Sequence, residues 1–164
     1  DLTVDEHLAF AAAAYHVSGA DELADRLLRE FELTSKRSAP ARELSRGMRQ
    51  KLAICCAYIH TPDVIFFDEP LTGLDPLGIR KLKTTMTDRA AEGAVVVVSS
   101  HLLAMVEDIC SHLLILKQGE QRFFGRVEEL RESYGIGAPD SSLEMAFFLA
   151  TDHPSAAFTL PPAR

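Results

Sequence analysis

Two adjacent carboxylates, Asp68 and Glu69, directly follow the wholly apolar run Val64–Phe67. Such a run predicts a buried strand of a parallel sheet, covered on both faces. Open α/β sheets bind their ligands beyond the carboxyl ends of such strands. Two carboxylates there suit phosphoryl transfer, in which Asp68 would hold Mg²⁺ through water and Glu69 would orient or deprotonate the attacking water. The alternative is an acidic loop that merely leaves a hydrophobic strand.

Two other segments are ambiguous when each is taken alone. In the segment Leu44–Met48, Ser45 and Gly47 lie just before a predicted helix, where backbone N–H groups and the helix dipole attract anions. Taken alone, this pattern is more typical of an ordinary serine N-cap. In the segment Leu71–Pro76, Asp75 is likewise interpretable as no more than a helix cap.

His101 follows a second apolar run, Val95–Val98, with Ser99 and Ser100 between them. We expect its imidazole at the same sheet edge as Glu69, because parallel strands end at a common edge. A lone histidine after a strand is usually incidental, so His101 gains weight only from the other motifs.

The order and spacing of the four groups resemble those of the ATP-binding cassette (ABC) family of nucleotide-binding subunits. Residues 45–47 resemble its signature, residues 64–69 its Walker B strand with the catalytic glutamate, residues 73–75 its D-loop, and His101 its switch histidine. The resemblance runs from about Leu2 to at least Leu130.

The resemblance implies an α/β fold, namely a partial RecA-like P-loop NTPase core with a parallel sheet and an ABC helical subdomain. It places the helical subdomain with the signature in residues 1–60. The core with Walker B, D-loop and switch histidine is expected in residues 61–120. A C-terminal strand and helices are expected in residues 121–150, and a flexible tail in 151–164.

The resemblance also implies ATP and Mg²⁺ as cofactors, and a head-to-tail dimer in which each signature faces the partner's ATP. The metal would be held by Asp68, while Glu69 and His101 would act in catalysis. The residues expected to bind the nucleotide or to couple the two sites are Ser45, Arg46, Gly47, Met48 and Asp75. A separate transmembrane permease would keep the otherwise cytoplasmic complex at the inner face of the membrane.

The signature-like segment departs from the commonest LSGGQ form, with Arg46 in place of a glycine and Met48 in place of the glutamine. Similar LSKGM-type sequences occur in subunits of ABC-2-type exporters, whose C-terminal halves end in a SLEEAFL-like helix. Residues 142–149, SLEMAFFL, match that helix loosely. The resemblance therefore implies an exporter-type subunit.

The sequence contains no GxxxxGK[ST] motif, the Walker A loop whose backbone cradles phosphates. In the ABC family this loop lies upstream of the helical subdomain. We therefore expect residues 1–164 alone to show no measurable ATPase activity and weak or no ATP binding. Two interpretations stay open: a transport ATPase seen without its N-terminal part, or a non-catalytic truncated protein that lends its signature to a partner. An ABC ATPase of DNA repair or of ribosomes is a third, disfavoured by the absence of a coiled coil or a tandem cassette.

Local signals predict most of the helices and strands. A capping-box pattern over 3–6 opens a helix to about His16, and an amphipathic helix carries Leu23, Leu27, Leu28 and Phe31 on one face. Residues 34–43 are interpreted as a loop and 141–144 as a second capping box. Alternation of strands at 64–67, 95–98 and 112–116 with helices predicts one parallel sheet. The other expected elements are helices at 48–60, 76–91, 99–110, 127–134 and 143–150, and an edge strand at 121–124.

Composition excludes some classes of function. The net charge of -7 and pI near 5.3 argue against a nucleic-acid partner, which usually needs a basic face. The three cysteines form no CxxC pair, which fits reduced thiols in a cytosolic protein better than a disulfide framework. No apolar run approaches the roughly 20 residues that a membrane-spanning helix needs.

Overall fold

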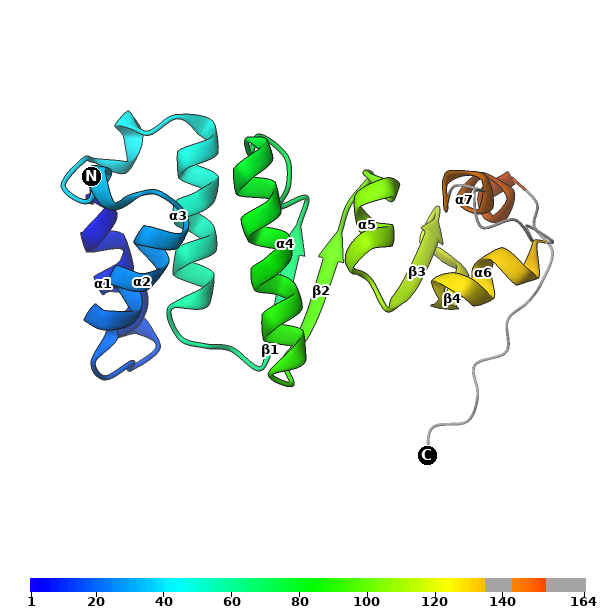
Figure 1. Ribbon diagram of the computed structural model, residues 1–164, viewed down its shortest axis with the longest axis horizontal. Coiled ribbons are helices and arrows are strands. Elements are labelled where there is room, and N and C mark those ends of the chain that lie inside the picture. Colours follow the sequence, from blue (N-terminus) through cyan, green and yellow to red (C-terminus); the bar gives the residue numbers. More distant parts are fainter. Residues whose placement is uncertain (135–142, 153–164) are drawn as a thin grey trace. The chain divides into compact units, whose positions relative to one another are not determined.

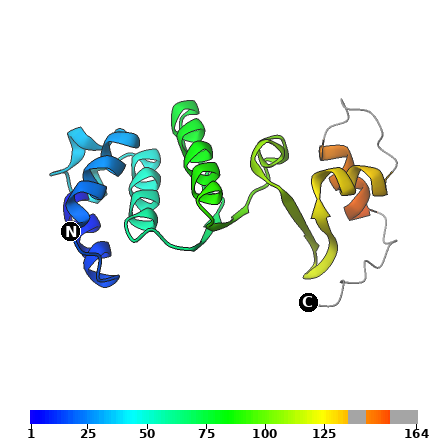
Figure 2. The same ribbon diagram turned by 60° about the horizontal axis from the view of Figure 1, so that its bottom comes forward.

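The computed structural model describes residues 1–134 and 143–152, and it divides into two compact units, Asp1–Ser100 and His101–Arg164 (Figure 1). The first unit contains α1 (Val4–Ala14), α2 (Ala20–Glu30), α3 (Arg46–Tyr58), β1 (Val64–Asp68), α4 (Pro76–Ala91) and β2 (Val95–Ser99), with short 3-10 helices at Thr34–Lys36 and Ala41–Glu43. The second unit contains α5 (Leu103–Ile109), β3 (His112–Lys117), β4 (Glu120–Arg126), α6 (Val127–Ser133) and α7 (Leu143–Asp152), as a second view also shows (Figure 2).

A local capping signal sets the start of α1. Thr3 Oγ1 accepts from the amide of Glu6 at 3.3 Å, and the Glu6 carboxylate accepts from the amide of Thr3 at 2.7 Å, which confirms the first capping box. In α2, Leu27 and Leu28 are buried as predicted.

The predicted loop 34–43 contains the two 3-10 helices, so it is more ordered than its polar composition indicates.

β1 and β2 form a parallel pair whose register runs from Val64↔Val95 to Asp68↔Ser99. Ile65 and Phe67 are buried on the face where α4 packs against β2 and where Tyr58 of α3 meets the Phe67 ring at 5.8 Å between centroids. On the opposite face, the alternate residues Val64, Phe66, Val95 and Val97 are exposed, Phe66 to 77%. The prediction of a strand covered on both faces is therefore wrong within this unit, because the unit's helices lie on one side of the sheet.

The third predicted strand does not extend this parallel sheet. β3 pairs antiparallel with β4 through a two-residue turn, Gln118 and Gly119, both with positive φ (54° and 79°). Such turns join adjacent antiparallel strands directly, so the alternation of strands and helices along the chain gave the wrong partner for 112–116. The α5 helix also begins at Leu103 and not at Ser99, which ends β2.

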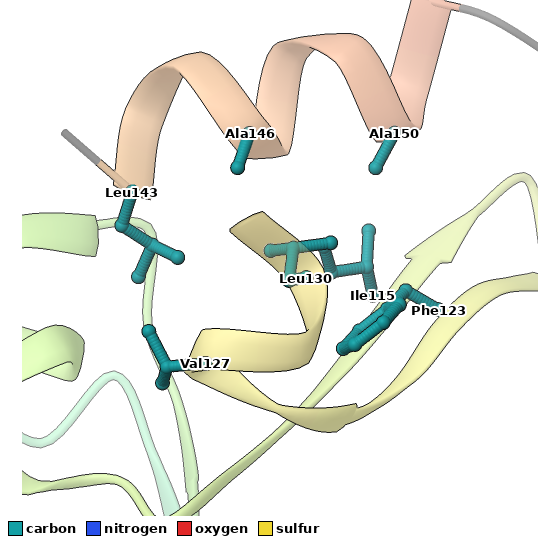
Figure 3. Packing of buried hydrophobic residues seen from close by; sticks show 7 residues of the cluster. All are labelled: Ile115, Phe123, Val127, Leu130, Leu143, Ala146 and Ala150. Carbon is teal, nitrogen blue, oxygen red and sulfur yellow. The ribbon is translucent and has the colours of Figure 1, made fainter. Parts of the chain in front are cut away.

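The second unit has its own hydrophobic core, in which α6 and α7 cover the β3–β4 hairpin (Figure 3). Leu130 of α6 is fully buried at its centre. The cluster consists of Ile115, Phe123, Val127, Leu130, Leu143, Ala146 and Ala150. The predicted helix from Leu143 is confirmed, whereas Ser141 and Ser142 of the second capping box and residues 153–164 of the predicted tail lie outside the described residues.

None of the helices in residues 1–134 and 143–152 has both the length and the apolar character that spanning a bilayer requires.

Candidate functional site

Asp68 and Glu69 lie where β1 ends, as predicted, and both interact with the last residue of β2. The Ser99 hydroxyl donates to Asp68 Oδ1 at 2.5 Å. The amide of Glu69 donates to the Ser99 carbonyl and to its hydroxyl oxygen, both at 3.1 Å. Ser99 therefore orients the first carboxylate and fixes the backbone of the second. Sequence reasoning missed this role, although the serine ends the apolar run that pairs with β1.

The backbone of Glu69 is unusual for a residue with a side chain. Its φ is +45°, in the left-handed region where a non-glycine residue is disfavoured by about 1–2 kcal/mol. The two hydrogen bonds from its amide to Ser99 offset this strain, and the Thr72 amide donates to the Glu69 carbonyl at 3.2 Å. The Glu69 side chain is half-buried, with Oε2 inaccessible to solvent. Strained backbone at the end of a strand is a frequent feature of functional sites.

The segment Ser45–Met48 forms the N-terminus of α3. Ser45 is the N-cap, and its hydroxyl oxygen accepts from the Met48 amide at 3.2 Å. Ser45 and Arg46 are exposed, while Gly47 and Met48 are half-buried. The first turn of a helix leaves amides without helical partners and carries a partial positive charge, to which the Arg46 guanidinium adds. This end of α3 is thus suited to an anion.

The same end of α3 lies against the loop that follows β1. A Cβ built on Gly47 would be 2.7 Å from the carbonyl oxygen of Gly73, and one on Gly73 would be 3.3 Å from Nε of Arg46. One turn further, the Gln50 amide group donates to the Pro70 carbonyl at 3.3 Å. Residues 45–47 and 73–75, singled out separately in the sequence, are therefore neighbours in one unit.

Asp75 is the N-cap of α4, as predicted. Its Oδ1 accepts from the Gly78 amide at 2.6 Å, and Pro76 occupies the first helical position. The hydrogen bond from Gly78, with a smaller contribution from nearby Lys51, holds the pKa of Asp75 below its ordinary value. Asp75 is accordingly a carboxylate at neutral pH.

Replacing Asp75 with alanine is expected to lower the free energy of unfolding by about 1 kcal/mol, because α4 loses its cap. Asp75→Asn is the matched control, since asparagine caps helices about equally well. Because the pKa of Asp75 is lowered by folding, its stabilisation is complete above the ordinary carboxyl pKa of about 3.9 and is lost as the pH falls through the lowered value. Urea unfolding measures both effects; equal stability of wild type and Asp75→Ala at neutral pH would contradict the capping role.

His101 is the first residue of the second unit and is exposed, two residues after the end of β2. Its expected approach to Glu69 stays a prediction. The predicted site residues of the first unit form two groups, one around Ser99 at the end of the parallel strands and one where α3 meets residues 70–78.

Comparison with known proteins gives matches over most of the chain. A family model described as "AAA domain, putative AbiEii toxin, Type IV TA system" matches residues 4–107. The ABC-type transporter ATP-binding protein EcsA of Bacillus subtilis is 38% identical over 138 residues, which are 83% of this chain and 56% of that protein. YbhF of Escherichia coli, described as a probable multidrug ABC transporter ATP-binding protein, is 31% identical over 150 residues, 90% of this chain and 26% of YbhF.

A solved structure, described as that of an ATP-binding subunit of an ABC transporter, superposes with a TM-score of 0.83 and 36% sequence identity. The superposition covers 92% of this chain and 62% of that chain. The chain thus spans about half the length of EcsA and about a quarter of YbhF, and its α/β fold matches that of the solved subunit. The chain therefore belongs to the ATP-binding subunits of ABC transporters.

Proposed function

We propose that residues 1–164 carry the metal-binding and water-activating part of an ATPase that energises transport through a separate membrane subunit. The observation that carries the proposal is the Asp68–Glu69 pair at the carboxyl end of β1, held by Ser99 of the neighbouring strand. Ligands of open α/β sheets bind at this edge. In this proposal Glu69 orients or deprotonates the attacking water, and His101 stabilises the γ-phosphate beside it.

Magnesium fits the carboxylates at this place. In the described residues no group of three or more histidine, cysteine, aspartate or glutamate side chains could hold a metal ion. Mg²⁺ does not need such a group, because it usually keeps several waters and binds one or two carboxylates together with substrate phosphates. Asp68, oriented by the Ser99 hydroxyl, is the residue that would hold it. When bound, Mg²⁺ neutralises charge on the β- and γ-phosphates.

We propose that the N-terminus of α3 faces ATP held by a second subunit in a head-to-tail dimer. The exposed Ser45 and Arg46, with Gly47 and Met48 in the same turn, present amides and positive charge at one end of the helix. Asp75 lies on the adjoining segment, where it would couple the two nucleotide sites. The partner's ATP would thus be contacted by the first turn of α3, whereas Asp68 and Glu69 lie at the end of β1.

The membrane partner of the proposal is a transmembrane permease, which would hold the subunit at the cytoplasmic face of the membrane. The description of YbhF as a probable multidrug transporter protein and the LSRGM form of residues 44–48 favour export. Measuring ATP hydrolysis by the complete gene product, with and without any membrane protein encoded beside its gene, tests this. Absence of hydrolysis under both conditions would favour a non-catalytic protein that only lends its signature to a partner.

Residues 1–164 alone are expected to bind Mg²⁺–ATP weakly or not at all, because their sequence has no glycine-rich phosphate loop. Calorimetric titration of this chain with ATP and Mg²⁺ measures the affinity, and the complete gene product is the control. We expect no saturation of residues 1–164 below about 1 mM, the upper end of common substrate affinities. Tight binding would mean that these residues contain a phosphate cradle of another kind.

A further inference from the structure

Lys51 on α3 is a buried cation that neither the motifs nor the proposed chemistry uses. Its residue exposure is 8%, and Nζ lies 3.4 Å from Asp75 Oδ2 and 3.5 Å from Glu32 Oε2. A lysine is almost never so buried unless it is paired. The two carboxylates come from opposite directions along the chain, 19 residues before and 24 residues after Lys51.

The two carboxylate oxygens of Asp75 have different partners. Asp75 uses Oδ1 to cap α4 through the Gly78 amide and Oδ2 to meet Lys51. A Cβ on Gly78 would be 2.7 Å from Asp75 Oδ1 and 3.0 Å from Cε of Lys51, so the lysine stem and the Asp75 carboxylate both lie close against the backbone of Gly78. The ammonium group therefore reaches Asp75 by packing directly on the first turn of α4.

Glu32 is the second carboxylate near Lys51, and its backbone position is fixed by its neighbours in the chain. It follows α2 in a left-handed conformation, with φ of +60°, between Phe31 and Leu33, which are 1% and 0% exposed. These two buried neighbours hold its backbone, and its side chain stays more than half exposed. Glu32 thus offers Lys51 a second carboxylate outside the 70–78 segment.

One face of α3 meets the 70–78 segment at three successive places. Gly47 lies against the Gly73 carbonyl, Gln50 donates to the Pro70 carbonyl, and Lys51 reaches Asp75. Positions 47, 50 and 51 are spaced so that they share one side of a helix. Among these contacts, that of Lys51 is the one between opposite charges.

We propose that Lys51 is a positioning residue that fixes Asp75, and with it the 73–78 segment, to the helix whose first turn carries Ser45 and Gly47. The inference rests on the proposed function, in which the first turn of α3 and the 73–78 segment both face the partner. The contact between Lys51 and Asp75 would make these two segments one rigid body. When ATP joins two subunits, both segments then meet the partner in a single fixed arrangement.

The test uses single variants of the complete gene product and one double variant. Lys51→Met keeps the length of the stem and removes the charge, and Asp75→Asn keeps the helix cap and removes the charge that Lys51 meets. Glu32→Gln is the matched control, because it neutralises the other carboxylate at a similar distance. The readouts are kcat and KM for ATP, the thermal midpoint, and hydrogen exchange of residues 71–79.

We expect Lys51→Met and Asp75→Asn each to lower kcat about 10- to 100-fold with KM little changed, because displacing aligned groups by about 1 Å has effects of this size. The double variant is expected to be no slower than the slower single one, since both remove the same contact. Glu32→Gln is expected to change kcat less than about twofold. Thermal midpoints of the single variants should stay within about 4 °C of wild type, because Lys51→Met leaves no unpaired buried charge and each carboxylate variant leaves Lys51 its other carboxylate partner.

Three results would overturn the inference: unchanged kcat in Lys51→Met, losses that multiply in the double variant, or a loss in Glu32→Gln as large as that in Lys51→Met. If the wild type hydrolyses no ATP, the proposed function fails, and hydrogen exchange decides the inference separately. Faster exchange of residues 71–79 in Lys51→Met and Asp75→Asn, but not in Glu32→Gln, supports the positioning role. Equal exchange in all of the proteins contradicts it.

Discussion

Replacing Glu69 with glutamine is expected to abolish ATP hydrolysis by the complete gene product while ATP-bound dimers still form. Glutamine has the shape of glutamate but cannot accept a proton from water, and loss of a general base usually lowers the rate by about 10²- to 10⁴-fold. The backbone bonds of Glu69 to Ser99 do not involve the carboxylate, so the turn should be preserved. Phosphate release measures the loss, and size-exclusion chromatography with ATP and Mg²⁺ measures the dimer.

Glu22→Gln provides a matched control, because this exposed glutamate lies in the first turn of α2 and belongs to neither group of candidate residues. It should hydrolyse ATP at the wild-type rate. Normal turnover by Glu69→Gln would show that another group activates the water. Loss of turnover in both variants would point to a general effect of lowered charge and would remove the argument for Glu69.

The candidate site was predictable where its signals are local. Asp75 caps α4 and is followed by proline, so the start of that helix is encoded in two adjacent residues. The apolar run before Asp68 is a strand because its residues pair with an equally apolar partner. Asp68 ends β1 and Glu69 follows it. The sequence pattern alone therefore predicted that both carboxylates lie at the carboxyl end of this strand.

Contacts between distant segments were not predictable in the same way. Ser99 meets Asp68 across 31 residues and Lys51 meets Asp75 across 24, and neither the serine nor the lysine has a distinctive sequence context. A lysine in a polar stretch of helix is normally interpreted as a solvated charge. Here Lys51 is 8% exposed, and its stem lies close against Gly78 in the first turn of α4.

The predictions of strand pairing and of sheet coverage were wrong for a related reason. Residues 112–116 are as apolar as a parallel strand, yet the turn at Gln118 and Gly119 gives them a closer antiparallel partner. The exposed residues Val64, Phe66, Val95 and Val97 are about as apolar as Ile65 and Phe67 on the buried face. Apolarity indicates that a strand can be covered, whereas coverage itself depends on which elements are present to pack on it.

Leu130→Ala is expected to be the most destabilising of the substitutions considered, lowering the free energy of unfolding of the second unit by about 2–5 kcal/mol. Leu130 is 0% exposed and lies between the hairpin and α7 in the cluster of Figure 3. Alanine would leave a cavity among side chains from β3, β4, α6 and α7, and neighbours such as Ala146 are too small to fill it. Urea-dependent hydrogen exchange of α6 and α7 measures the loss.

Leu116→Ala is the matched control, because it removes the same atoms from the same unit at a residue that is 58% exposed. It should cost about 1 kcal/mol or less, since surface substitutions have small effects. The comparison also tests whether the two units unfold separately. If they do, Leu130→Ala raises exchange in α6 and α7 and leaves α1 and α3 protected, because their core contains none of the cluster residues. Equal losses for the two leucine variants would contradict a packed core in the second unit.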